Sequence, residues 1–194
     1  DLVFAGPRMF HEETSPATAA SLWAARARNV ENALHASHCL VVRTHAFGRS
    51  PVPAHAGFAE RAVTALLAGE MPVADGLRHA TPLYAGDLAV LLWRAVELRL
   101  QGLYHLAGAE RTSPYRFVLE LASLMGATLP PGGSSPWLSD NPVLNEETSL
   151  NSKRARRALE MATPLLREGL QRFIDQGRSE WRTLGRIASR EAAA

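Results

Sequence analysis

Residues 81–117 read TPLYAGDLAVLLWRAVELRLQGLYHLAGAERTSPYRF, and this stretch decides the fold class. Apolar residues recur at helical spacing over Asp87–Leu100, which predicts a largely buried helix. The short apolar run Gly102–Leu106 predicts a strand covered on both faces, as in parallel sheets. Ser113 and Pro114 then give a helix start signal, and Gly126 gives the stop. The stretch therefore predicts a helix, strand and helix of a parallel α/β sheet.

The same alternation continues toward the N-terminus. Leu2-Val3-Phe4 predicts a buried strand that enters a loop, and Ala17–His35 predicts a helix. Cys39–Arg43 predicts a second strand covered on both faces, with Cys39 as a small buried side chain. Phe58–Ala68 predicts a helix closed by Gly69. Parallel neighbours need crossover connections, and these helices supply them.

The remaining segments are expected to be loops and shorter elements. His45–Gly57 and Leu129–Thr148 are rich in Pro and Gly and predict loops, and Met71–Pro82 predicts a short extended pair around a turn at Asp75-Gly76. Two further helices are expected over Ser152–Leu159 and Pro164–Gln176. In a parallel sheet, ligands bind beyond the carboxyl ends of the strands, so the candidate ligand loops follow Phe4, Arg43 and Leu106.

Composition narrows the functional classes. The 194 residues carry a formal charge of +2, which is too balanced for nucleic-acid binding by the whole domain. No run of about 18 apolar residues predicts a membrane span, and no signal peptide is visible, so we expect a cytoplasmic protein. Cys39 is the single cysteine and cannot form an internal disulfide. His35, His38 and Cys39, with His11 and Glu12, have a spacing that could ligate a metal. Without an HExxH or paired-cysteine pattern we predict no metal site, because histidines near a helix end more often interact with its terminal carbonyls.

Four sequence blocks, in this order, carry a resemblance to a known family. They are DLVFAG at residue 1, LVVRTHAFG at residue 40, the stretch quoted above, and ETSLNSKRARRAL at residue 147 followed by LLREGLQRF. Together they resemble the dTDP-4-dehydrorhamnose reductase family of extended short-chain dehydrogenases, from residue 1 to about residue 175. The resemblance implies an α/β fold: a partial Rossmann-like parallel sheet with flanking helices, plus a small substrate-binding α/β subdomain.

The resemblance also implies a chemistry. In the family, NADP or NAD binds one half of the protein and a nucleoside-diphosphate sugar binds the other. A Tyr-x-x-x-Lys pair lies on the helix that follows the strand matching the start of this chain, and its tyrosine donates a proton in the reduction. With Glu31 aligned to the glutamate that follows this pair, Trp23 stands at the tyrosine position and Ala27 at the lysine position. Neither side chain transfers a proton. We therefore predict no catalytic residues in this chain.

The resemblance places the candidate binding residues on the sugar-nucleotide side. They are Arg43, Thr44, His45, Phe47 and Gly48, which match the family's loop beside the substrate, and Tyr84 and Asp87, which match residues at the start of a helix facing it. Two alternatives stay open: Arg43 can bond carbonyls at the sheet end, and Asp87 can be a plain N-cap. Leu144 stands where relatives show an arginine that grips the diphosphate.

The predicted function is that of a sugar-nucleotide-binding protein related to NADP-dependent 4-keto-sugar reductases and catalytically incomplete in this chain. No Gly-rich phosphate loop occurs in the 194 residues, so we expect sequence before Asp1 to be missing, and the chain itself to bind NADP, NAD or no cofactor. The alternative is a non-catalytic regulatory or binding subunit that keeps the reductase fold, as in the regulatory β subunit of methionine adenosyltransferase. Such a protein would work as a homodimer or with a partner subunit.

The predicted organisation is a domain over residues 1–177 and a basic amphipathic helix or tail over residues 178–194. Arg178, Arg182, Arg186 and Arg190 recur every four residues, while Trp181, Leu184 and Ile187 gather on another side. Such a stripe can contact an acidic partner, an anionic lipid surface or RNA, but it is more often a solvated face of a helix packed on its own domain. The same interpretation applies to the basic group Arg154, Arg156 and Arg157.

Overall fold

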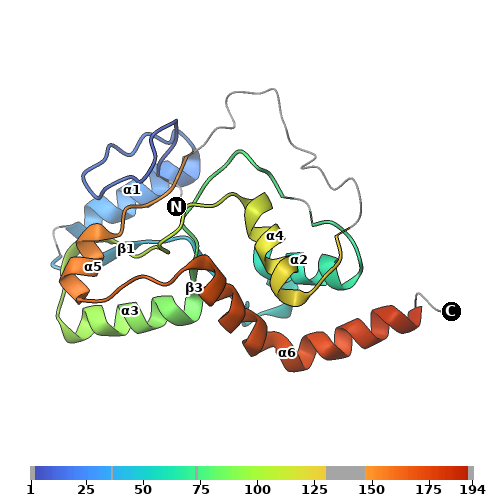
Figure 1. Cartoon of the computed structure of the whole chain (residues 1–194). Helices are drawn as coiled ribbons and strands as arrows, with labels where there is room; N and C mark the ends of the chain where they lie inside the picture. The colour runs from blue at the N-terminus through green and yellow to red at the C-terminus, as the bar shows by residue number, and fades with distance from the viewer. Residues whose placement is uncertain (1–2, 36, 73, 130–146, 192–194) are drawn as a thin grey trace.

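Two pairs of parallel strands organise the chain in a computed structural model (Figure 1), which describes residues 3–35, 37–72, 74–129 and 147–191, without the side chains of residues 35, 53 and 179–191. Strand β1 (Leu40–Arg43) pairs with β4 (Gly102–His105), so that the last residues of the two strands lie side by side. Strand β2 (Ala46–Phe47) pairs with β3 (Leu83–Tyr84). The predicted parallel α/β class is confirmed.

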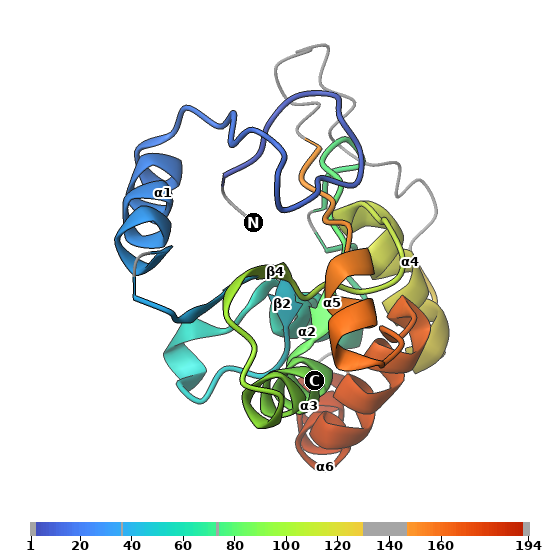
Figure 2. The ribbon, with the colours of Figure 1, turned by 90° about the vertical axis from the view of Figure 1, so that its left-hand side faces the viewer.

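Helices cover both faces of the β1/β4 pair. Helix α1 (Leu22–His35) packs on β1, while α3 (Ala85–Glu97) and α5 (Lys153–Leu159) lie on the opposite face, as Figures 1 and 2 show. Because side chains alternate along a strand, Val42 and Tyr104 face the α3 and α5 side, whereas Arg43 faces α1. This alternation places the charged end of β1 beneath α1.

A second α/β unit contains the β2/β3 pair. Helices α2 (Phe58–Leu67), α4 (Pro114–Met125) and α6 (Leu166–Glu191) pack together around one apolar cluster, in which Phe117, Leu121, Leu170 and Phe173 are almost fully buried. A further short 3-10 helix, η1 (Pro53–His55), precedes α2. The arrangement matches the small α/β subdomain predicted from the sequence. Helix α6 continues without a break past residue 177, and in Figure 1 its C-terminal part extends beyond α2 and α4.

Helix α4 shows the predicted start and stop signals at work. The Ser113 side chain accepts a hydrogen bond from the Arg116 N–H at 3.3 Å, and Pro114 occupies the first helical position, where no N–H donor is needed. Gly126 ends the helix with a positive φ of 65°, a conformation that suits glycine. These predictions are confirmed.

The N-terminal segment differs from the prediction. Helix α1 begins at Leu22 and not at Ala17, because the Ala19 N–H donates to the Val3 carbonyl at 3.0 Å and the Thr18 hydroxyl bonds to Ala5. These tertiary bonds replace the first helical turn that alanine propensity favours. Val3 and the neighbouring phenylalanine are buried, but within the described residues they form no strand.

Two predictions of burial are wrong. Cys39 is exposed because β1 begins one residue later, so its side chain lies in the turn between α1 and the strand. Helix α3 runs over Ala85–Glu97 and is only half buried: Val90, Trp93 and Val96 are 57–69% exposed. Its outer face is therefore apolar and open.

The connecting segments carry more structure than predicted in one case and less in another. The expected loop over residues 45–57 contains β2 and η1. In the described part of residues 71–82 there is no hairpin; instead, the Asp75 carboxylate accepts the N–H groups of Leu77 and Arg78. Most of the predicted loop Leu129–Thr148, with the Leu144 position, lies outside the described residues, as does Leu2 of the predicted first strand. Within the described residues, no helix combines the length and apolarity that crossing a membrane requires.

Candidate functional site

The carboxyl ends of β1 and β4 carry a buried polar cluster. The register of the two strands sets Arg43 opposite His105, and both side chains point toward α1. Both residues are buried, at 8% and 0% exposure. The predicted residue Arg43 is therefore the centre of an internal network.

Arg43 uses its guanidinium in three directions. Its Nε and Nη2 donate to the two carboxylate oxygens of Glu31 on α1, at 2.7 and 2.6 Å. Its Nη1 lies 3.4 Å from Nε2 of His105, and its plane covers the ring of Phe4 at 4.9 Å. A guanidinium has only donors, so Nε2 of His105 must accept.

His105 is held in one neutral form. Its Nδ1 lies 3.0 Å from the carbonyl oxygen of His11, which accepts only, so Nδ1 carries the hydrogen. Burial, reinforced by the charge of Arg43, lowers the pKa of His105 from 6.5 to about 4. The backbone N–H of His105 donates to Oε1 of Glu13 at 3.0 Å. The imidazole is thus a neutral bridge between β1 and the N-terminal loop.

His11 continues the cluster on the loop. Its ring stacks on Phe4 with centroids 4.0 Å apart, and its Nε2 donates to the carbonyl of Glu147 at 3.1 Å. Burial lowers its pKa. The carboxylate of Glu147 in turn pairs with Arg111 at 2.6 Å, which holds the pKa of that carboxyl below its usual value against the opposing effect of burial. The loop is therefore fixed over the strand ends by polar contacts.

Thr44 and His45 extend from the same strand end. Thr148 donates its hydroxyl hydrogen to the His79 carbonyl at 3.0 Å, so it accepts from Nε2 of His45 at 3.2 Å. Burial lowers the pKa of His45 well below 6.5, which keeps the ring neutral. Its Nδ1 and the Thr44 hydroxyl are buried and have no hydrogen-bond partner among the described residues. The Thr44 hydroxyl and the His45 ring, both predicted to bind a ligand, therefore lie inside the protein.

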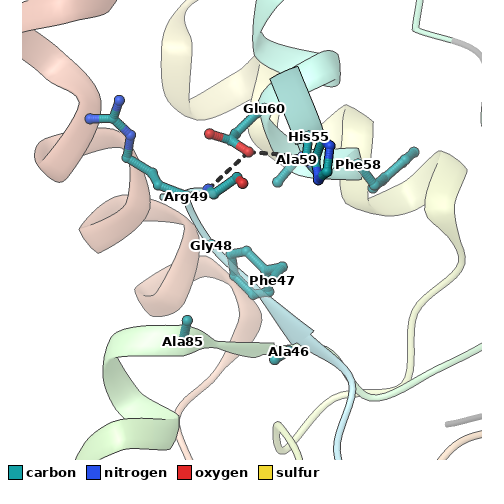
Figure 3. Close-up of a pocket in the computed structure, with 11 residues that line it drawn as sticks. Ala46, Phe47, Gly48, Arg49, His55, Phe58, Ala59, Glu60 and Ala85 are labelled. Carbon is teal, nitrogen blue, oxygen red and sulfur yellow. Dashed lines mark hydrogen bonds between the residues drawn. The ribbon is translucent and has the colours of Figure 1, made fainter. Parts of the chain in front are cut away.

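The next two predicted residues line a pocket of about 240 Å³ (Figure 3). Phe47 and Gly48 form one wall, and η1 and the start of α2 form the other. Gly48 permits the close approach of helix α3, because a Cβ there would lie 2.8 Å from the Cβ of Ala85. The lining includes Phe47, Gly48, Arg49, His55, Phe58 and Glu60.

Glu60 shapes this pocket from inside. Its Oε2 accepts the N–H groups of Ser50 and Gly57, at 3.1 and 2.8 Å, and so ties the loop after β2 to the start of α2 (Figure 3). Apolar rings and backbone groups therefore border one hollow, and the Arg49 side chain extends from its edge away from Phe47 and Phe58 (Figure 3). Such a mixture is typical of small-molecule sites.

Tyr84, which is paired with Phe47 in the β2/β3 register, and Asp87 contact α6. The Tyr84 hydroxyl donates to Oε1 of Gln176 at 2.8 Å, and Asp87 pairs with Arg172 at 2.8 Å. Tyr84 is the N-cap of helix α3, so Asp87 is the third residue of the helix. The alternative that Asp87 is the N-cap, which the sequence left open, is therefore wrong. Gly169 of α6 packs against Phe47 and both of these side chains.

Helix α1 carries the residues that the sequence prediction set at the family's catalytic positions. Trp23, Ala27 and Glu31 are four residues apart and so lie along one side of the helix. Trp23 is 64% exposed and lies under the guanidinium of Arg26 at 5.3 Å. Ala27 packs against the apolar cluster that contains Phe4. The described residues of this face offer no proton donor with a neighbouring ammonium.

Sequence reasoning missed several residues that the structure brings together. His105 was treated as part of an apolar strand, although a histidine opposite an arginine in neighbouring strands signals a polar end to the sheet. His11 was considered only as a metal ligand, and Arg49, His55 and Glu60 were treated as loop or helix residues. Among the described residues, no group of three or more His, Cys, Asp or Glu side chains is arranged to hold a metal ion.

Comparisons with known proteins found solved structures with a similar fold. No protein-family model and no curated protein sequence matches the chain. Among solved structures, dTDP-4-dehydrorhamnose reductase from Bacillus anthracis, in complex with NADP, superposes with a TM-score of 0.74 at 19% identity, over 90% of this chain and 62% of that one. A hypothetical dTDP-4-dehydrorhamnose reductase from Sulfolobus tokodaii gives a TM-score of 0.66 at 24% identity, over 87% and 59%.

Related enzymes share the fold. UDP-glucose 4-epimerase from Thermotoga maritima, solved with UDP-glucose, gives a TM-score of 0.72 at 19% identity, over 92% of this chain and 61% of that one. The resemblance predicted from the sequence is thus confirmed at the level of the fold, which is that of dTDP-4-dehydrorhamnose reductases and related epimerases and dehydratases. The chain spans about three fifths of the length of these structures.

Proposed function

We propose that this chain, which has the fold of sugar-nucleotide reductases and epimerases, binds a nucleoside-diphosphate sugar without reducing it. The observation that supports binding most directly is the pocket after β2, at the carboxyl end of a parallel strand, where ligands of α/β sheets bind. The residues Phe47 and Gly48, proposed from the sequence, lie in its wall.

The chemistry of the pocket suits such a ligand. Phe47 and Phe58 offer apolar ring surface for a base, and in this proposal the Arg49 side chain at the pocket edge turns its guanidinium toward a phosphate of the bound ligand. Arg43, Thr44 and His45 support the loop from beneath through the buried cluster, and Tyr84 and Asp87 hold it against α6. In this proposal these five residues position the pocket, and only its lining touches the ligand.

The side chains at the family's catalytic positions do not fit a nicotinamide cofactor. A reductase needs an acidic hydroxyl beside the ring and an ammonium at the ribose. Here Trp23 is largely exposed, and Ala27 packs into the Phe4 cluster with only a methyl group. At these positions the chain therefore supplies neither the proton nor the ribose contact that a bound NADP or NAD would need.

The second candidate function is a non-catalytic regulatory subunit. The identities of Trp23 and Ala27 favour it, since they leave the fold intact while removing its chemistry. The exposed apolar residues of α1, among them Leu22, Trp23 and Val30, suit a protein partner or a second copy. We further propose residues 1–177 as the folded binding unit, residues 178–194 as an appended helix, and the cytoplasm as its location.

Isothermal titration of the chain with UDP-glucose, dTDP-glucose and NADPH tests the first candidate. We expect heat from at least one of the two sugar nucleotides and none from NADPH. The absence of binding to both sugar nucleotides would contradict the binding function and leave the regulatory candidate, which size-exclusion chromatography with light scattering then tests through self-association.

A further inference from the structure

A second pocket, of about 560 Å³, lies between the N-terminal loop and helix α5. It shares no lining residue with the pocket of Figure 3. The loop contributes Glu12 and Glu13, and the other wall contributes Asn151, Lys153, Arg154 and Arg157. Its volume is within the range of small-molecule sites.

The cations of this pocket come from one side of α5. Lys153 and Arg157 are one helical turn apart and so lie next to each other, with Arg154 beside them. Ala155 and Leu159 are buried on the opposite side and anchor the helix to the core. Arg156 carries the same charge on the same helix but does not line the pocket. Of the basic group Arg154, Arg156 and Arg157 noted in the sequence, Arg154 and Arg157 therefore line the pocket and Arg156 does not.

Arg154 is held in place by an aromatic ring. Its guanidinium lies 4.6 Å from the ring centroid of Tyr104, a buried residue of β4. Contact with the ring face leaves the N–H donors at the guanidinium edge available. Among the residues that the structure describes, none of the three cations of this pocket forms an ion pair.

The two carboxylates only partly balance this charge. Glu13 is already bound through Oε1 to the backbone N–H of His105, and Glu12 is exposed. Three cations against two carboxylates give the lining a net charge of +1. A monoanion gains little from such a site, whereas an anion with several charges and many acceptor oxygens can accept from all three cations.

We propose that this pocket binds the phosphate groups of a small phosphorylated ligand, separately from the site of Figure 3. The N–H of His105 at the end of β4 lies beside Glu13, so the pocket opens at the carboxyl edge of the β1/β4 pair. Lys153 and Arg157 provide the charge, Arg154 provides a preoriented fork, and Glu12 limits the affinity.

Isothermal titration calorimetry of the full chain with inorganic pyrophosphate tests this site. Arg157→Gln is expected to weaken binding about tenfold, the loss that follows from one charge-assisted hydrogen bond. Arg156→Gln, the matched control, is expected to change it by less than about twofold, because an exposed charge outside the pocket is screened. Glu12→Gln is expected to tighten binding, since it removes a repelling carboxylate.

The proposal would be overturned by no binding of pyrophosphate, by equal losses in Arg156→Gln and Arg157→Gln, or by weaker binding in Glu12→Gln. Thermal unfolding of each variant verifies that it is folded. The site is also separable from the sugar-nucleotide pocket, because Arg49→Gln should leave pyrophosphate binding unchanged. A loss of pyrophosphate binding in Arg49→Gln would assign the phosphate to the pocket of Figure 3 instead.

Discussion

The guanidinium of Arg43 and the carboxylate of Glu31 meet in two parallel hydrogen bonds, Nε to Oε1 at 2.7 Å and Nη2 to Oε2 at 2.6 Å. This pair joins the end of β1 to α1 and thereby fixes which side of α1 faces the sheet. Because Ala27 lies one turn before Glu31, the pair also determines that a methyl group points into the Phe4 cluster.

Removal of one partner should therefore be costly. Glu31→Gln leaves the buried guanidinium of Arg43 without its counter-charge, and we expect a loss of about 2 kcal/mol in the free energy of unfolding. Glu97→Gln, which removes the exposed pair with Arg94, should cost less than about 0.5 kcal/mol. Urea unfolding of both variants measures the difference, and equal losses would show that the Arg43 pair has no special weight.

The buried histidines predict a loss of stability in acid. Burial lowers the pKa of His105 from 6.5 to about 4, so between these values the unfolded chain binds a proton that the folded chain refuses. Stability is fully present above pH 6.5 and falls as the pH decreases toward 4. The contribution of His105 alone should fall by about 2 kcal/mol between pH 7.5 and pH 5.

Urea unfolding at these two pH values, with and without His105→Gln, measures this linkage. The variant is expected to be less stable at pH 7.5 but to lose less stability on acidification. An unchanged slope in the variant would mean that the other buried histidines, His11 and His45, carry the effect.

The close approach at Gly48 predicts a rescuable substitution. Gly48→Ala places a Cβ 2.8 Å from that of Ala85, which should push β2 from α3 and cost about 1–3 kcal/mol. Adding Ala85→Gly removes the colliding atom and should restore most of this loss, apart from the helix propensity of glycine. Thermal unfolding of the single and double variants tests it, and failure of the rescue would place the strain elsewhere.

The proposed division of the chain predicts a tolerated truncation. Among the α6 side chains that the structure describes, the apolar ones in the main core are Leu166, Leu170, Phe173 and Ile174, all before residue 177. Deletion of residues 178–194 should therefore change the midpoint of thermal unfolding by only a few degrees. Loss of a cooperative transition would mean that the final helix belongs to the folding unit.

Local patterns predicted the elements whose signals agree with their packing. Strands β1 and β4 carry apolar residues up to their polar last residues, Arg43 and His105, and α4 has both a cap and a glycine stop. The start of α1 could not be predicted, because Ala19 donates to Val3 across a loop, and an alanine run carries no sign of that bond. The sequence shows that Cys39 precedes an apolar run but not that the strand begins one residue later.

The site was predictable only in part for the same reason. A resemblance in the block LVVRTHAFG points to Arg43, Phe47 and Gly48, but the partners of Arg43 come from segments 12 and 62 residues away. Their convergence depends on strand register and on how α1 packs, which no local pattern specifies. The basic group of α5 likewise divides into pocket and solvent positions only once the helix is oriented by Ala155 and Leu159.

The most direct test of the binding function compares two arginines by calorimetry with UDP-glucose and dTDP-glucose. Arg49 lines the pocket of Figure 3, whereas Arg61 lies on α2 outside it and bonds to the Ala56 carbonyl. We predict that Arg49→Gln weakens binding of the sugar nucleotide about tenfold. Arg61→Gln should weaken it by less than about twofold. Equal affinities in both variants and the unaltered chain, or no binding by the unaltered chain, would contradict it.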